Sequence, residues 1–249
     1  MKNKLTNRIG MKKQNNNGSN MTIIEYDNCQ NIIVEFDNNY KTKTTFFDFM
    51  RGKVRNVYEK TFYNIGYIGE GKYNLTYNRQ LTPSGEVWHS MLTRCYNNKF
   101  LNKNTTYKDC IMCEEWHNFQ NFAKWHEENY YQIENEKMDL DKDILIKGNK
   151  IYSPETCIFV PHIINMLFTD SKNKENNLPK GVRIIKRPKP YNTRYNGIHL
   201  GCFNTLVEAF EAYKTFKEEH IKEIANKFKD QIPEKLYNAL YNYKVEITD

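Results

Sequence analysis

Residues 181–210 read GVRIIKRPKP YNTRYNGIHL GCFNTLVEAF, and this stretch decides the fold of the C-terminal part of the chain. Three short strand-like pieces in it are separated by Arg187-Pro188-Lys189-Pro190 and by Asn196-Gly197. Asn-Gly is a strong signal for a two-residue hairpin. Thr205 and Glu208 then have the spacing of a capping box, which predicts that a helix begins here. We therefore predict a three-stranded sheet followed by one helix.

The same helix is predicted to be long. Its apolar residues recur at helical spacing, and the pattern runs on to Phe228. Pro233 then breaks it before a last short helix that holds Leu236 and Leu240. The residues expected on its buried side are Leu206, Ala209, Phe210, Tyr213 and Phe216, continued by Ile221 and Ile224.

Residues 176–207 contain no Asp or Glu. Such a segment creates a local positive field rather than a balanced, solvated surface, and it favours an anionic partner such as DNA. The alternative is an exposed basic hairpin with no partner. The cations of this basic strip are Lys180, Arg183, Lys186, Arg187, Lys189 and Arg194.

A family resemblance covers the same region. Gly181-Val182-Arg183, Tyr191, Arg194, Leu200-Gly201, Phe203, Thr205, Glu208-Ala209 and Ala212-Tyr213 resemble the plant ethylene-response-factor (APETALA-type) fold, which also occurs in phage homing endonucleases. Tyr191 stands where that family has a tryptophan. The resemblance implies that the sheet lies in the major groove, with Arg183 and Arg194 at bases or phosphates. It also implies that Lys186, Arg187 and Lys189 contact phosphates, which position the protein without specifying a sequence.

A second informative stretch lies at residues 139–168 and is predicted to form a strand, a turn, a strand and a helix. Leu140 to Ile146 is strand-like, and Lys147-Gly148-Asn149-Lys150 is a turn. Ile151 and Tyr152 begin the second strand-like part. Pro161 suits the first position of a helix that runs to Phe168.

This stretch, with the helices before it, resembles the HNH-type homing endonucleases of phages. The lead-in is carried by Trp88-His89-Ser90-Met91, Arg94-Cys95-Tyr96, Tyr107, Cys113-Glu114-Glu115-Trp116, Phe119 and Phe122, and the finger by Leu140-Asp141-Lys142-Asp143-Ile144, Tyr152-Ser153-Pro154-Glu155-Thr156-Cys157 and Asn165. The resemblance implies a degenerate ββα finger that binds one Mg²⁺ and uses it in DNA cleavage.

The resemblance also assigns roles to single residues. Asp141 and Asn165 are the candidate metal ligands, and Lys142 stands at the position of the general-base His. A lysine with its ordinary pKa is a poor base. Thr156 stands at the position of the loop Asn. His162, one helical turn before Asn165, is an alternative metal ligand.

Two further readings of this stretch stay open. Asp143 is two residues after Asp141, so both carboxylates are expected on one face of a strand and could approach one cation. Alternatively, the finger is a scaffold that has lost its chemistry.

The whole chain is predicted to be α+β, in six segments. These are a basic flexible arm (1–20), a small β-rich module of unknown role (21–80), an HNH-like ββα domain with a helical lead-in (82–170), a linker (171–180), a three-stranded sheet plus helix that binds DNA (181–230) and a C-terminal helix and tail (231–249).

Bulk composition bounds the remaining possibilities. The chain has 249 residues and a formal net charge of +7, which suits an anionic partner. Its six cysteines are scattered, so reduced thiols in a cytosolic setting, the phage-infected bacterial host, are expected. Cys110-x-x-Cys113 has the spacing of half a zinc site, but no second pair follows, so no zinc is expected. No apolar run is long enough to cross a membrane.

Three functions fit these observations. The first is a Mg²⁺-dependent endonuclease or nickase. The second is a double-stranded DNA-binding protein without catalysis, such as a regulator. The third is a protein-interaction module, for instance a phage protein that blocks a host factor, in which the basic strip binds an acidic protein surface.

Overall fold

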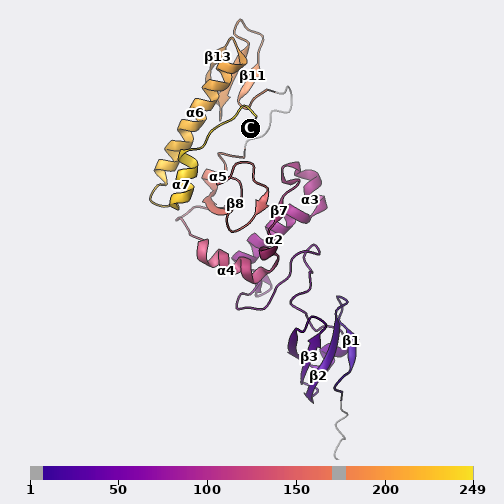
Figure 1. The fold of residues 1–249 in the computed structure, drawn as a ribbon. Helices are drawn as coiled ribbons and strands as arrows, with labels where there is room; N and C mark the ends of the chain where they lie inside the picture. The colour runs from indigo at the N-terminus through magenta and orange to yellow at the C-terminus, as the bar shows by residue number, and fades with distance from the viewer. Residues whose placement is uncertain (1–7, 170–177, 249) are drawn as a thin grey trace, which may run out of the picture. The chain divides into compact units, whose positions relative to one another are not determined.

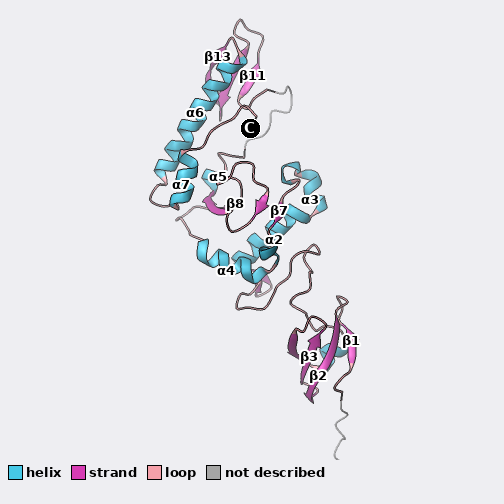
Figure 2. Cartoon of the chain, viewed as in Figure 1, coloured by secondary structure: helices cyan, strands magenta, loops and turns pink. Residues whose placement is uncertain are grey.

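The computed structural model describes residues 8–169 and 178–248. Helices hold 33% of the described residues and strands 24%, so the predicted α+β class is confirmed. The described residues divide into two compact units. Their helices and strands are drawn in Figures 1 and 2. The first unit holds residues 8–108 and 112–127, and the second holds residues 109–111, 128–169 and 178–248.

The first unit begins with an antiparallel sheet in the order β1-β2-β3-β4. Its inward side chains alternate along the strands, as the period of two of a half-buried strand requires. They pack against Phe49 of α1 to form one core with Met21, Ile23, Ile32, Val34, Phe36 and Val54. The elements are β1 (Lys12–Gln14), β2 (Asn20–Asn28), β3 (Asn31–Phe36), β4 (Lys41–Thr44) and α1 (Phe46–Met50).

The remainder of the first unit is mainly helical. Trp88 and Trp116 are fully buried, and the indole of Trp88 donates a hydrogen bond to the carbonyl of Trp116 at 2.7 Å. The predicted apolar helix faces are therefore core. Its elements are β5 (Thr76–Tyr77), β6 (Gln80–Leu81), α2 (Pro83–Tyr96), α3 (Asn98–Lys103), the 3₁₀ turns Thr105–Tyr107 and Glu114–His117, β7 (Ile111–Met112) and α4 (Phe119–Asn129). β7 and α4 each have residues in both units.

The second unit starts with an antiparallel strand pair followed directly by a short helix. β8 (Met138–Asp141) pairs with β10 (Ile158–Pro161), and α5 (His162–Asn165) begins at the next residue. β9 (Ile151–Tyr152) lies in the long connection and pairs with β7 instead.

The predicted finger is therefore only partly right. The strand expected from Leu140 to Ile146 ends at Asp141, because the Asp141 side chain accepts backbone hydrogen bonds that turn the chain. The strand begins two residues earlier than expected and pairs with residues 158–161. The helix expected from Pro161 begins at His162 and ends at Asn165.

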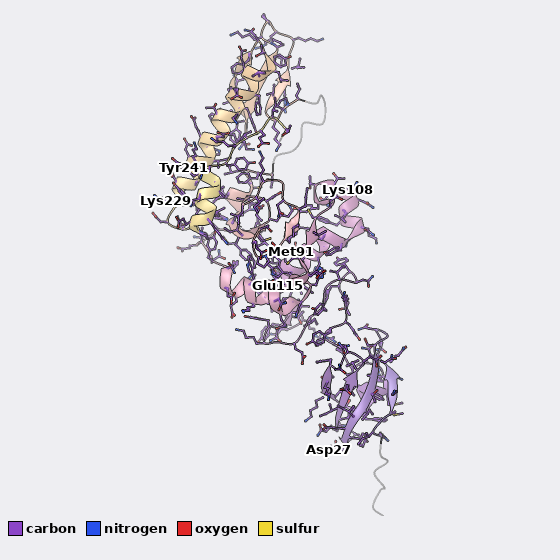
Figure 3. All side chains as sticks on the ribbon, in the orientation of Figure 1. Asp27, Met91, Lys108, Glu115, Lys229 and Tyr241 are labelled. Carbon is purple, nitrogen blue, oxygen red and sulfur yellow. The ribbon has the colours of Figure 1, made fainter. Side chains whose placement is uncertain are left out.

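The predicted three-stranded sheet is present, in the order β11-β12-β13. Its strands are β11 (Val182–Ile184), β12 (Tyr191–Tyr195) and β13 (Ile198–Phe203). Both connections are antiparallel hairpins, and the second turns at Asn196-Gly197 as expected. α6 (Leu206–Lys227) packs on one face, and its capping box of Thr205 and Glu208 is formed. α7 (Glu234–Tyr241) follows Pro233; Figure 3 labels Tyr241 at its end.

The flexible basic arm predicted for residues 1–20 is partly wrong. Residues 12–14 form β1 and Asn20 begins β2, with Lys12 and Lys13 in register with Thr22 and Met21. The linker expected at residues 171–180 lies mostly outside the described residues. The described part of the chain has no helix long and apolar enough to cross a membrane.

Candidate nucleic-acid interface and hairpin cluster

The sheet β11–β13 has one covered face and one open face. Val182, Thr193 and Tyr195 point towards α6 and are buried. The hydroxyl of Thr193 donates to the carbonyl of Ala209 at 3.1 Å, which fixes the sheet on the helix. Side chains that alternate with these three lie on the opposite face.

The strand register defines this open face. Arg183 lies opposite Asn192, which lies opposite Cys202, and Arg194 lies opposite His199. Directly opposed residues of an antiparallel pair share a face. Arg183, Arg194 and His199 are exposed, and Asn192 and Cys202 are half-buried. The open face therefore presents two guanidinium groups, an amide, an imidazole and a thiol, with no carboxylate among them.

Further cations lie at one end of this face. Lys186, Arg187 and Lys189 are exposed in the β11–β12 turn. The turn is closed by the backbone hydrogen bond from Ile185 to Pro190, at 2.8 Å. The structure thus gathers on one sheet, or at its turn, all five residues predicted to bind DNA.

The close fit of sheet and helix depends on Gly181. Its φ is +76°, and a Cβ placed there would lie 2.1 Å from the Tyr213 ring. Only glycine combines a left-handed backbone with such a close approach. The backbone of Gly181 also accepts a hydrogen bond from the amide of Arg194, at 2.8 Å. Gly181 therefore helps to set the position of Arg194.

Sequence reasoning missed Asn192, His199 and Cys202 on this face. The β13 residues of the open face can be assigned only once the register is known, and the register shifts by a bulge between Thr193 and Arg194. On β12 a signal was present, because Asn192 and Arg194 alternate with Tyr191, Thr193 and Tyr195 in the strand that leads to the Asn196-Gly197 turn.

The second candidate site lies where β8 meets α5. The carboxylate of Asp139 contacts two side chains of the helix, with Oδ2 lying 2.6 Å from Nδ1 of His162 and accepting from Asn165 at 3.1 Å. Lys137 forms an ion pair with the other oxygen at 3.3 Å. Burial alone would raise the pKa of Asp139, but these hydrogen bonds and the Lys137 charge outweigh it and hold that pKa below its usual value. We call Asp139, His162 and Asn165 the hairpin cluster.

Asp141, predicted as a metal ligand, occupies a different position. One of its oxygens accepts the backbone amides of Asp143 and Ile144, at 2.8 and 2.7 Å. Burial and the neighbouring Asp143 raise its pKa to about 6, although these amides lower it. Asp141 therefore shapes the loop after β8, and Asp139 takes the place beside Asn165 that the resemblance gave to Asp141.

Lys142, predicted at the general-base position, is buried and pairs with Asp143 at 3.0 Å. Burial favours the neutral amine, but attraction to Asp143 dominates and leaves the pKa of Lys142 raised. A lysine with a raised pKa is an ammonium ion at neutral pH, and an ammonium ion has no lone pair to accept a proton. The structure thus argues against Lys142 as a base.

The loop between β8 and β10 is held by an asparagine that sequence reasoning read only as part of a turn. The amide of Asn149 donates to the carbonyls of Lys142 and Ile151, both at 2.7 Å. Thr156 also donates to the carbonyl of Ile151, at 2.7 Å. Thr156 was assigned the place of a loop-positioning Asn, and it shares that task with Asn149.

The cysteine pair has no evident ligand role. Cys110 is buried, and burial raises the pKa of its thiol, which opposes the thiolate form that binds metal. Cys113 is half-buried. Within residues 8–169 and 178–248, no three His, Cys, Asp or Glu side chains are arranged to hold a metal ion.

The chain was compared with protein-family models, curated proteins and solved structures. No protein-family model, no curated protein and no solved structure matches the chain.

Proposed function

We propose that the chain binds double-stranded DNA, with the open face of the β11–β13 sheet in the major groove. The observation that carries the proposal is the composition of that face: it holds Arg183 on β11 with Asn192 and Arg194 on β12, and the surrounding residues 176–207 contain no acidic residue. A major groove about 12 Å wide admits a small β-structure, and its base edges offer hydrogen-bond acceptors.

The residues proposed to contact DNA fall into two groups, those that contact base edges and those that contact phosphates. The arginine fork can pair with O6 and N7 of guanine, and an asparagine amide can pair with N6 and N7 of adenine. Arg183, Arg194 and Asn192 suit the first role because they project from paired strands. Lys186, Arg187 and Lys189 project from a turn at the end of the sheet and suit contacts with phosphates.

A charge-matched pair of variants tests this proposal. The double variant Arg183→Ala and Arg194→Ala is expected to lose at least about 30-fold in affinity for duplex DNA, since each good base contact contributes about 1–3 kcal/mol. The control Lys229→Ala and Lys235→Ala removes two charges from exposed positions after α6 and in α7. Its affinity should change by less than about threefold. Equal losses in both variants would show that only net charge matters and would contradict the proposal.

A second binding experiment distinguishes DNA from other acidic partners. Binding to a duplex is compared with binding to heparin of similar charge. Preference for the duplex supports a groove-reading sheet, whereas equal binding would favour an acidic protein surface as the partner.

The hairpin cluster supports a second candidate function, Mg²⁺-dependent nicking of the bound DNA. The observation that favours it is the convergence of one carboxylate, one imidazole and one amide, from Asp139, His162 and Asn165, at the junction of β8 and α5. Carboxylate and amide oxygens suit Mg²⁺. Both Asp139 oxygens already have partners, Oδ2 with His162 and Asn165 and Oδ1 with Lys137, so a bound cation would replace these contacts.

The metal, when bound, would polarise a phosphate oxygen and neutralise charge on the leaving group. The chain's own part is to hold the ligands. Asp139 orients His162 and Asn165 towards one point, and Lys137 offsets the negative charge of the free cluster. Lys142 stays outside this chemistry because of its raised pKa.

Incubation with supercoiled DNA and Mg²⁺ or Mn²⁺ tests the second function. Nicking that is lost in Asp139→Asn but retained in the surface control Asp230→Asn would support a catalytic cluster. Salt-sensitive binding with no nicking under either metal would leave a DNA-binding protein without catalysis.

A further inference from the structure

One helix, α6, takes part in two separate cores of the second unit. Its first half packs against the DNA-facing sheet through Phe210 and Tyr213, which lie in a core with Tyr195. Its second half belongs to another core, which it shares with the β8–β10 hairpin and α5. The residues of this second core are Ile133, Ile144, Ile158, Val160, Ile164 and Leu167 from the hairpin side, with Ile221, Ala225, Phe228, Ile232, Leu236 and Leu240 from α6, α7 and their connection.

α6 itself is well suited to rigidity. Its 22 residues include no glycine or proline, and sharp kinks arise almost always at such residues. His220 still contacts the sheet, because its Nδ1 lies 2.9 Å from the hydroxyl of Tyr195. Ile221, the next residue, is already fully buried in the hairpin core. No exposed stretch of helix separates the two cores, so little room is left for a hinge.

The C-terminal segment, residues 243–246, makes a second connection. Its backbone at Val245 donates to Glu218 at 2.9 Å and accepts from Lys214 at 2.7 Å, both on α6. On the other side, Tyr243 contacts the Phe168 ring with centroids 4.9 Å apart. The segment therefore joins the middle of α6 to the residues just after α5 by a route independent of the helix itself.

We propose that α6 and residues 243–246 hold the open face of the sheet and the hairpin cluster at one fixed separation, so that both contact the same duplex at a constant offset. The inference rests on the proposed DNA binding and extends it, because it assigns the hairpin cluster a defined place on the DNA. It does not require the cluster to cleave DNA. Domains joined only by a flexible linker would instead sample many separations.

The helix sets the scale of the offset. Tyr213, in the sheet core, and Ala225, in the hairpin core, are twelve residues apart. At 1.5 Å per residue this is about 18 Å along the helix. Since successive base pairs are 3.4 Å apart, this corresponds to an offset on the order of five base pairs for a helix that lies along the duplex axis.

Site-directed photo-crosslinking measures this offset without any need for cleavage. Azidophenylalanine is placed at His199, on the open face opposite Arg194, in one protein and at Met166, directly after Asn165, in another. Both side chains are exposed, so folding should survive. Each protein is bound to a duplex carrying one selected target, irradiated, and its crosslinked nucleotide is mapped by primer extension.

The proposal predicts one narrow crosslinking position for each probe, with the same separation, on the order of five base pairs, on every target. A Met166 position that spreads over ten or more base pairs, beside a sharp His199 position, would overturn it and would leave DNA binding intact. No crosslink from Met166 in the bound complex would likewise overturn it. No target-dependent crosslink from either probe would refute the proposed DNA binding itself.

Discussion

The sheet β11–β13 and the hairpin β8–β10 both lie in the second unit, yet they differ in how their pairing is determined. The sheet strands follow one another with turns of two and six residues between them. The hairpin strands are separated by residues 142–157, and pairing across that connection is fixed by Asn149, Thr156 and Asp141. Local turn chemistry decides the first register, while polar side-chain contacts to the backbone decide the second.

The difference matters for function. A register fixed by short turns holds Arg183 and Arg194 on one face through backbone geometry alone. The hairpin cluster depends on hydrogen bonds between part-buried and exposed side chains, each of which contributes about 0.5–1.5 kcal/mol. We therefore expect the sheet to be sensitive to steric changes and the hairpin to be sensitive to changes of charge and hydrogen bonding.

The largest expected effect is that of Gly181→Ala. The new Cβ would lie 2.1 Å from the Tyr213 ring on a backbone with a φ of +76°. Strain and overpacking together should cost about 3 kcal/mol of unfolding free energy. Urea denaturation measures the loss. The control Gly197→Ala shares a positive φ, +85°, but meets nothing within 4 Å, and should cost about 1 kcal/mol. Equal losses would show that the packing on Tyr213 is unimportant.

The next effect concerns pH and Asp141. Its folded-state pKa is raised to about 6, so between its unfolded pKa near 4 and pH 6 the folded state binds more protons than the unfolded chain. Stability contributed by this group is therefore present below about pH 4 and is lost as pH rises to 6. Two pKa units correspond to about 2–3 kcal/mol.

Asp141→Asn tests this sign, since the amide oxygen can still accept the backbone amides of Asp143 and Ile144. The unfolding free energy of the variant, relative to the parent, should rise between pH 4 and pH 6.5. A constant difference across this range would mean that the carboxyl is not buried as described.

Asn149→Ala should have a smaller effect, about 2 kcal/mol, because the carbonyls of Lys142 and Ile151 lose a donor. Hydrogen exchange should speed up in residues 142–157 and stay unchanged in the β11–β13 sheet. Uniformly faster exchange in both regions would contradict the idea that the two registers are held independently.

The smallest expected effect is that of Thr205→Ala, which removes one half of the capping box of α6. Loss of such a cap costs about 1 kcal/mol. The melting temperature should fall by a few degrees. A loss of several kcal/mol would mean that Thr205 has a further role.

The sheet β11–β13 and the hairpin β8–β10 also differ in how well the sequence predicted them. The three strands, the capping box, the long helix and the helix after Pro233 were predicted, because each has a local signal: Asn196-Gly197, Thr205 with Glu208, and a period of 3.6. The β8–β10 pairing and the position of Asp139 were not. Met138 and Leu140 alternate with Asp139 and Asp141, so the strand could be found, but the resemblance gave the ligand role to Asp141 and no local signal pointed to Asp139. Only the position of α5 distinguishes them, and that is set by tertiary packing.

The most direct test of the central claim is the affinity for duplex DNA measured across a range of salt concentrations. If the six cations of the basic strip each neutralise a phosphate, the logarithm of the binding constant should fall against the logarithm of the salt concentration with a slope near −5. Because Arg183 and Arg194 are proposed to read bases, a slope between about −3 and −5 agrees with the account. A flat response, or no binding at low salt, would contradict it.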